Sequence, residues 1–340
     1  MAIDIRTYGA IPDGTTDNAA AINAALLEGD IIIQNGLFLH NTSLKVPSNR
    51  TVYIENAEVK LGDNCFDNTF RNLDFDNGNI NVKILGLGNA VINGNAANNN
   101  DPDYIEYGGR DSDNIYKTNR IILCNVDNFE VAGLNIVDRA TYVACLQKAT
   151  NGEVHDLYFN YYTVVANQDG IAILEGSNNI KLYNLDGYCK DDFLSINLSK
   201  GCETGVKITN YNVGDVHDIL YHHINVRGSG NGSLLALITG DGKKIYNITS
   251  RDHMTRGGSV FYTAYGAGYN NVPPAKTDIH DIIMDNIVVN ANLQANLFLF
   301  GLDMMNFAAT NITNNTVKGL YQIISGDQTD NVKINGVQVT

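Results

Sequence analysis

The chain has 340 residues, a formal net charge of -14, and no Trp. The excess of acidic residues argues against nucleic acid and anionic membranes as partners, because both carry negative charge themselves. No apolar stretch approaches the roughly 18 residues of a membrane-spanning helix, and no charged-then-apolar leader opens the chain.

The first predicted element is a helix over residues 16–29. It opens with a Thr-Asp cap, places Ile22 and Leu26 on one face, and ends at Gly29. We expect this helix to lie across the N-terminal end of the fold, where it would shield core and strand edges. Residues 1–30 are therefore predicted to form an N-terminal strand and a capping helix.

Short apolar runs without helical periodicity recur along most of the chain. Most of their starts lie about 25 residues apart, and the longer intervals fit the same unit with a loop insertion. A second series of short runs interleaves with the first, giving two or three strands per turn. This pattern is typical of a parallel β-helix and excludes helix bundles and doubly wound sheets. The first series comprises residues 142–146, 170–174, 193–197, 234–238, 259–263, 297–300 and 320–324.

The repeat predicts one all-β domain over residues 1–340, with coils and inserted loops from about residue 31. Asn is abundant and Gly occurs 32 times, which suits tight corners with left-handed backbone. Pro occurs 5 times, as expected where most of the backbone donates hydrogen bonds to neighbouring strands. We therefore interpret most Asn and Gly residues as structural.

Three carboxylates stand immediately before two of the apolar runs. Asp169 precedes the run that starts at Gly170, and the acid pair Asp191–Asp192 precedes the run that starts at Phe193. Because the two runs start 23 residues apart, a coil of that length would stack Asp169 on Asp192 at one strand spacing, about 4.8 Å. Like charges that close raise the pKa of at least one of them. The alternative is that these acids only cap turns.

Basic and aromatic residues are candidates to complete this site. Aligning successive coils by their asparagine-like corners predicts equivalent places for Tyr188, Arg227 and Arg251, a few residues before the acids. Guanidinium groups there would bind a carboxylate or phosphate on a substrate, or neutralise the acids. The alignment does not fix the place of Arg256.

The cysteines show neither zinc spacing nor a disulfide framework, and no motif for a metal or cofactor is present. We therefore expect no cofactor. Cys145 lies inside an apolar run and is predicted to be a core residue. The five cysteines are Cys65, Cys124, Cys145, Cys189 and Cys202.

Three segments of the chain resemble the pectate-lyase-like superfamily of right-handed parallel β-helices. Residues 4–18 look like its N-terminal signature, and residues 119–134 are similar to coils that precede its active site. Residues 167–170 and the acid pair match the Asn-x-Asp and Asp-Asp motifs of polygalacturonase-like family 28 glycoside hydrolases and related phage tailspike depolymerases. The chain departs from that family in lacking a recognisable Gly-His-Gly or Arg-x-Lys; the nearest downstream histidine is His217.

The resemblance implies a hydrolase that cleaves a long glycan, which can be acidic, by carboxylate acid and base catalysis. It implies that Asp192 is the general acid, with its proton held by neighbouring charge, and that Asp169 and Asp191 position water. Family likeness favours inversion, although the spacing of stacked coils also permits retention. The candidate substrate-binding residues are Asn167, Gln168, Tyr188, His217, Arg227 and Arg251.

The same resemblance predicts a polysaccharide partner, a location outside the cell or on a virion, and a homotrimer as the assembly to test. Two other functions stay open. One is a Ca²⁺-dependent polysaccharide lyase or epimerase, because clustered Asp residues suit Ca²⁺ and an Arg could abstract the proton next to a uronic carboxylate. The other is a non-catalytic, glycan-binding receptor protein in which the acids merely form turns.

Overall fold

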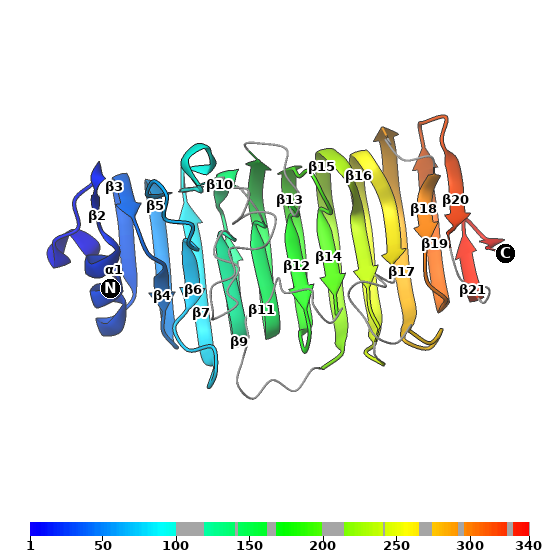
Figure 1. Ribbon diagram of the computed structural model, residues 1–340, viewed down its shortest axis with the longest axis horizontal. Helices are drawn as coiled ribbons and strands as arrows, with labels where there is room; N and C mark the ends of the chain where they lie inside the picture. The colour runs from blue at the N-terminus through cyan, green and yellow to red at the C-terminus, as the bar shows by residue number, and fades with distance from the viewer. Residues whose placement is uncertain are drawn as a thin grey trace. The chain divides into compact units, whose positions relative to one another are not determined.

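The computed structural model describes residues 1–99, 119–139, 142–161, 168–198, 214–240, 242–264, 274–291, 296–324 and 329–339. These residues fall into two compact units, unit 1 up to residue 168 and unit 2 from residue 169. Each unit is built from parallel strands that wind in successive coils (Figure 1). That the chain forms a single domain stays a prediction.

Unit 1 starts with β1 (Ile3–Asp4), the 3-10 turn η1 (Ile5–Tyr8), β2 (Asp13–Asp17) and α1 (Ala19–Glu28). Successive coils then pair in parallel, β3 with β5, β5 with β7, β7 with β9 and β9 with β11. The remaining elements of unit 1 are β3 (Ile31–His40), β4 (Leu44–Val46), β5 (Arg50–Leu61), β6 (Phe70–Asn72), β7 (Asn79–Leu87), β8 (Val91–Asn93), η2 (Ala96–Asn98), β9 (Ile121–Ala132), β10 (Asn135–Arg139) and β11 (Ala144–Tyr161).

The predicted N-terminal helix is present as α1 but begins at Ala19, because Thr16 and Asp17 belong to β2 and Asn18 is the N-cap residue. Ile22 and Leu26 are fully buried, as the apolar face predicted, and Asp17 accepts a hydrogen bond from the N–H of Ala19 at 3.0 Å. The N–H of Gly29 bonds back to the carbonyl of Ala25 at 3.1 Å and ends the helix. Figure 1 shows α1 at the N-terminal end of unit 1. That it seals the core there stays a prediction.

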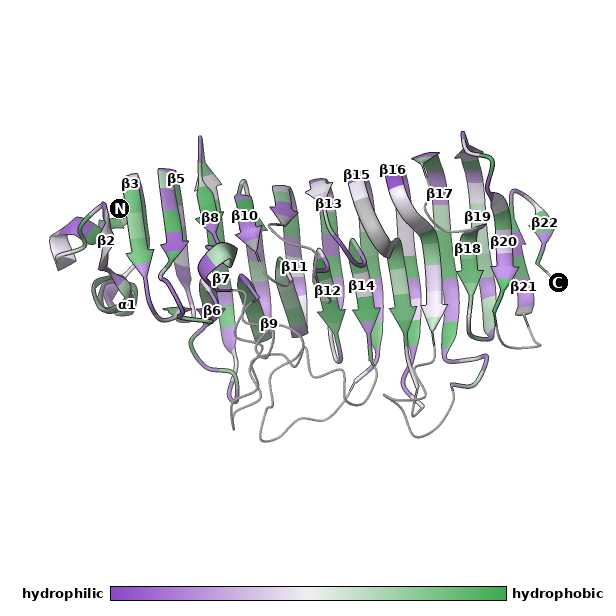
Figure 2. Cartoon of the chain, turned by 45° about the horizontal axis from the view of Figure 1, so that its top comes forward, coloured by the Kyte–Doolittle hydropathy of each residue, from purple (hydrophilic) through white to green (hydrophobic). Residues whose placement is uncertain are grey.

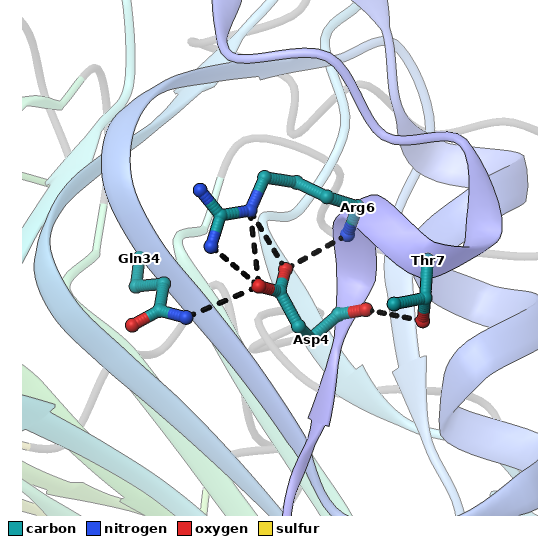
Figure 3. Close-up of polar contacts among 4 residues, drawn as sticks. All are labelled: Asp4, Arg6, Thr7 and Gln34. Carbon is teal, nitrogen blue, oxygen red and sulfur yellow. Dashed lines mark hydrogen bonds and ion pairs between the residues drawn. The ribbon is translucent and has the colours of Figure 1, made fainter.

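A carboxylate ties the N-terminal turn to the first long strand (Figure 3). Asp4 caps η1 by accepting from the backbone N–H of Arg6 at 3.0 Å, and it also pairs with the guanidinium of Arg6. Gln34 of β3 donates to the same carboxylate at 3.1 Å. Hydrogen bonds from Arg6 lower the pKa of Asp4 to about 2, against the opposing effect of burial. The ion pair thus stabilises the turn itself, and the hydrogen bond from Gln34 joins the turn to β3.

Unit 2 contains two parallel ladders. One runs β12, β14, β15, β16, β18, β20, and the other runs β13, β15, β16, β17, β19, β21. The strands are β12 (Ile171–Leu174), β13 (Asn178–Tyr188), β14 (Leu194–Asn197), β15 (Val216–Ile238), β16 (Ile245–Ala264), β17 (Ile279–Ala291), β18 (Asn296–Phe300), β19 (Met304–Asn314), β20 (Gly319–Ile323), β21 (Thr329–Ile334) and β22 (Val337–Gln338).

The long strands β15 and β16 belong to both ladders because they turn at corners within the strand. Two corners recur on each coil of unit 2, and their residues have left-handed backbone, which Asn and Asp tolerate better than other residues with a side chain. The amide of Asn247 donates to Asp218 on the coil before it at 2.9 Å. The first corners are Asn179, Asp218, Asn247, Asp281, Asn306 and Asn331, and the second corners are Asn184, His223, Asp252, Asn286 and Asn311.

The core lies inside the coils. Its side chains are mainly Ile, Val, Leu and Phe, and Phe261, Phe298, Phe300 and Phe307 pack their rings 5.0 to 6.4 Å apart. Figure 2 shows β12 and β14 coloured mainly as hydrophobic. Burial of apolar side chains on every coil explains why the runs of the sequence predict strands.

Candidate active site

The strands β12 and β14 bring the predicted acids together in unit 2. Ile171 pairs with Leu194, and the N–H of Gly170 donates to the carbonyl of Asp192 at 2.8 Å. Asp169 therefore stands one coil before Asp192, in the register that the sequence spacing predicts. The roles of the three acids stay predictions.

The acids differ in their contact with solvent. Asp169 is only 5% exposed, and its Oδ2 accepts a hydrogen bond from the buried hydroxyl of Ser195 at 3.4 Å. Asp191 and Asp192 each retain a partly exposed surface. Carboxyl groups in unequal environments are the arrangement that separates acid and base roles.

The pKa of Asp192 is strongly raised. Burial of its carboxyl and, second, the charge of Asp191 raise its pKa to about 7, against hydrogen bonds from Ser233 that lower it. The residue keeps some exposed surface, yet protein atoms crowd around the carboxyl itself, and this crowding is the larger cause. The sequence analysis expects neighbouring charge to be the main cause of the raised pKa. The spacing of the acids shows their register but not how closely protein atoms surround each carboxyl group.

Two residues of β15 support the acid pair and were missed by sequence reasoning. The N–H of Ser233 donates to Oδ1 of Asp192 at 2.6 Å. A Cβ on Gly232 would lie 2.1 Å from the carbonyl carbon of Asp191, so only glycine fits against this backbone. The sequence offers a partial signal, the Gly-rich stretch before Leu234, but the long insertion ahead of this coil hides its register.

Tyr262 also belongs to this site. Ser195 pairs with Ala236 on the next coil, and Ala236 pairs with Tyr262 on the coil after that. Burial raises the pKa of Tyr262, as do the negative charges of Asp192 and Asp191. Aligning the apolar runs 193–197, 234–238 and 259–263 by their first residues would have placed Phe261 opposite Ser195 and missed Tyr262 by one residue.

Two of the predicted substrate contacts lie on neighbouring coils. Tyr188 is 39% exposed and pairs with Gly228, next to Arg227. Arg227 forms an ion pair with Asp186, in which Nη2 and Oδ2 are 2.7 Å apart. Tyr188 ends the strand segment before the turn to the acids, and Arg227 ends the neighbouring segment on the next coil, before the turn to Ser233.

The predicted alignment of Arg251 with Arg227 is wrong. Arg251 pairs in register with His222 and Asp285, and its guanidinium bonds to Asp252 at 2.8 Å. Each coil has two left-handed corners, and the sequence alignment matched the first corner of one coil to the second corner of another.

Arg256 takes the place that was predicted for Arg251. Val226 pairs with Thr255 and Ser229 with Gly257, so Arg256 lies at the level of Arg227.

Of the remaining predicted contacts, His217 lies away from the acids, whereas Gln168 directly precedes Asp169 in the chain. His217 bonds through Nδ1 to Asp218 at 2.6 Å and stacks on Tyr246 at 4.8 Å, beside the first corners. Gln168 is fully buried in unit 1, and Asn167 lies outside the described residues.

Of the cysteines, Cys145 is buried in the core, as predicted, and Cys189 is also buried, with its thiol 3.0 Å from the carbonyl of Asp191. Cys202 falls outside the described residues. In the part of the chain that the structure describes, no three His, Cys, Asp or Glu side chains are grouped as a metal site. No helix within these same ranges is long and apolar enough to cross a bilayer.

No protein-family model matches the chain, but comparison with known proteins finds a relative along most of it. The pre-neck appendage protein of Bacillus phage B103 is 24% identical over 305 residues, which covers 86% of this chain and 34% of that protein. The chain thus spans about one third of the length of this relative.

Solved structures with a similar backbone include a family 28 exopolygalacturonase from Yersinia enterocolitica. The TM-score is 0.65 at 15% identity, with 100% of this chain and 79% of that chain covered. A tailspike protein of E. coli bacteriophage HK620 has a TM-score of 0.63 at 14% identity, with 92% and 57% covered. These likenesses show that the chain has the right-handed parallel β-helix fold.

Proposed function

We propose that this chain is a polysaccharide depolymerase that hydrolyses glycosidic bonds within a long glycan. The observation that carries the proposal is Asp192, whose pKa is raised to about 7 while Asp169 stands in register one coil away. Glycoside hydrolysis needs one carboxyl group that is protonated at working pH and a second that is ionised. A carboxyl with a strongly raised pKa beside further acids fits the first of these roles.

The three acids then divide into a general acid and a base. Asp192 donates its proton to the leaving glycosidic oxygen. Asp169 and Asp191 together act as the base that positions the attacking water. In an inverting reaction the water occupies the space between acid and base, which requires carboxyl groups roughly 6.5 to 9.5 Å apart. The anomeric configuration of the product, measured by NMR during the reaction, tests inversion against retention.

The substrate we propose is a long glycan, acidic in at least some of its units. Arg227 and Arg256 end neighbouring strand segments, just before the turns that lead to Ser233 and Ser259 on the coils after the acid pair, where they can bind carboxylate or phosphate groups. Tyr188 beside them offers an exposed ring for stacking on a sugar. A glycan on a bacterial surface fits the likeness to phage appendage and tailspike proteins.

The likenesses to a phage appendage protein and to a tailspike also support a proposal about where the protein acts. We propose that the chain is carried on a virion, where a depolymerase clears polysaccharide before attachment. A homotrimer is the assembly to test, by sedimentation equilibrium of the purified protein. A monomer at micromolar concentration would reject the trimer and would leave the proposed hydrolysis unaffected.

The deciding experiment compares wild type, Asp192→Asn, Asp169→Asn and the control Asp330→Asn on a panel of bacterial surface glycans and pectic polymers. Asp330 is an exposed acid of unit 2, paired with Lys276. We expect new reducing ends from wild type and the control, and losses of at least about a hundredfold for the two site variants. Equal rates in wild type and Asp192→Asn would reject the assignment.

Product masses separate the alternatives in the same experiment. Hydrolysis adds one water to each cleaved bond, whereas a lyase leaves an unsaturated product that absorbs in the ultraviolet. Calcium dependence would favour the lyase or epimerase function. Binding of a glycan without any shortening, unchanged in Asp169→Asn and Asp192→Asn, would favour a receptor-binding protein.

A further inference from the structure

We propose that the dipeptide Gly232–Ser233 is a positioning element that orients the carboxyl group of Asp192 and fixes which of its oxygens carries the catalytic proton. The inference rests on the proposed function, since it concerns the acid of that reaction. Neither residue touches the glycan in this proposal. Both act through Asp192.

The backbone N–H and the carbonyl of Ser233 bond to Asp192 and to the residue that follows it. Its N–H donates to Oδ1 of Asp192 at 2.6 Å, and its carbonyl accepts from the N–H of Phe193 at 2.7 Å. The first bond is not one of the usual backbone–backbone bonds between strands, because its acceptor is a side chain. One residue thus fixes both the backbone after Asp192 and the rotation of its carboxyl group.

Gly232 allows this approach. A Cβ at this position would lie 2.1 Å from the carbonyl carbon of Asp191 and 2.3 Å from the nitrogen of Asp192. Real Cβ atoms do not come that close to backbone, so any other residue would push the two chain segments apart. Such a shift would lengthen the bond from Ser233 to Asp192.

The hydroxyl of Ser233 anchors the element from the other side. Ser233 pairs in register with Ser259 on the next coil, and the two hydroxyl oxygens are 2.7 Å apart. Both residues are buried, 3% and 1% exposed. The position of Ser233 is therefore determined by the coil on each side of it.

This geometry determines where the proton of the acid lies. Oδ1 accepts from a peptide N–H and is the better place for negative charge, so the proton of the neutral form resides on Oδ2. The same N–H stabilises the carboxylate and opposes the effect of burial on the pKa of Asp192. Without it, Asp192 would lose its proton less readily and at a higher pH.

The first test follows titration by NMR without any glycan. In wild type the amide proton of Ser233 should shift with pH at the same midpoint as the carboxyl carbon of Asp192, near pH 7. Asp192→Asn, which also assigns the carboxyl signal, should abolish the shift. A Ser233 amide that does not follow Asp192, or an Asp192 midpoint near the ordinary value of about 4, would overturn the inference.

The second test uses substitutions. Ser233→Pro removes the N–H and should raise the midpoint of Asp192 by about one pH unit, whereas Ser233→Ala keeps the N–H, loses only the smaller contribution of the hydroxyl, and should raise the midpoint less. Equal midpoints in Ser233→Pro and wild type would reject the role of the N–H. Should Ser233→Pro not fold, the wild-type amide titration still decides.

A second glycine supplies the matched control for strain. Gly301, just after β18, is also packed against backbone, because its Cβ would lie 2.3 Å from the carbonyl oxygen of Thr263. Gly232→Ala and Gly301→Ala should both lower stability. Only Gly232→Ala should move the Asp192 midpoint and the high-pH limb of the activity profile.

A shift of the same size in both glycine variants would reduce Gly232 to a structural residue and overturn its positioning role. The titrations need no substrate. Failure of the proposed hydrolysis would therefore leave them unchanged, and the two proposals fail separately.

Discussion

The N–H of Gly170 donates to the carbonyl of Asp192 at 2.8 Å, which joins the two acid-bearing turns by backbone alone. The distance between the turns is then set by the coil and depends little on the acid side chains. Substitution of Asp169 or Asp192 should therefore change chemistry without moving the other acid. This makes charge-removing variants at these positions informative.

Activity should fall as the pH rises through about 7. The pKa of Asp192 is raised to about 7, so its protonated fraction declines above that pH. A general acid must be protonated to work, and kcat/KM should drop about tenfold per pH unit beyond the midpoint. A pH profile on a glycan that is cleaved checks this. Activity that stays level to pH 9 would contradict the role of Asp192 as acid.

Asp192→Asn should stabilise the protein at neutral pH. The folded pKa of Asp192 lies above its unfolded value, so the favourable contribution of the neutral form is complete below about pH 4 and is lost as the pH rises towards 7. Asparagine avoids that loss because it never ionises. We expect a gain of at least about 1 kcal/mol in the free energy of unfolding at pH 8, and little gain at pH 4. Urea unfolding at both pH values measures it, with Asp330→Asn as the control.

Tyr262→Phe should lower kcat/KM by about tenfold, the effect of one lost hydrogen bond in the transition state. The phenol lies in the electric field of the acid pair, at the register position of Ser195. The ring itself is retained, so the free energy of unfolding should change little. Unchanged kinetics would place Tyr262 outside the reaction.

Arg256→Ala should raise KM for an acidic glycan more than Arg251→Ala does. Arg256 lies at the level of Arg227, whereas Arg251 lies at the level of His222 and is bonded to Asp252. Both variants remove the same charge from the chain, so the comparison cancels long-range electrostatic effects. Initial rates at several glycan concentrations test the order, and a larger effect for Arg251→Ala would contradict the register argument.

Asn247→Ala should lower the free energy of unfolding by about 2 kcal/mol, the sum of a lost hydrogen bond and a strained backbone. Asn247 has a left-handed backbone with φ of 55° and donates to Asp218 on the coil before it. Glycine loses only the bond, because it adopts this backbone freely. Asn247→Gly should therefore cost about 1 kcal/mol less than Asn247→Ala in urea unfolding. Similar losses in the two variants would show that the backbone angle is not the cause.

The fold and the register of the acids were predictable from the sequence because both depend on a repeat. Apolar runs mark the strands, and the spacing between the runs at Gly170 and Phe193 is the same as that between the paired residues Ile171 and Leu194. Local chemistry was enough for α1 as well, where Ile22 and Leu26 mark the buried face.

The support around Asp192 was harder to predict. Leu194 pairs with Leu235 across a much longer stretch of chain, so no regular spacing points from Asp192 to Ser233. Arg251 was misplaced because two corners on each coil have similar residues. The burial that raises the pKa of Asp192 arises from packing in three dimensions, which no sequence spacing reveals.

The unequal coil lengths of unit 2 have an evolutionary consequence. β14 stays in register with both β12 and β15, although far more of the chain separates Leu194 from Leu235 than separates Ile171 from Leu194. Segments between strands can therefore lengthen, shorten or be exchanged while the hydrogen-bonded frame keeps its alignment. A protein built this way can acquire new loops by recombination and keep its cluster of acids intact.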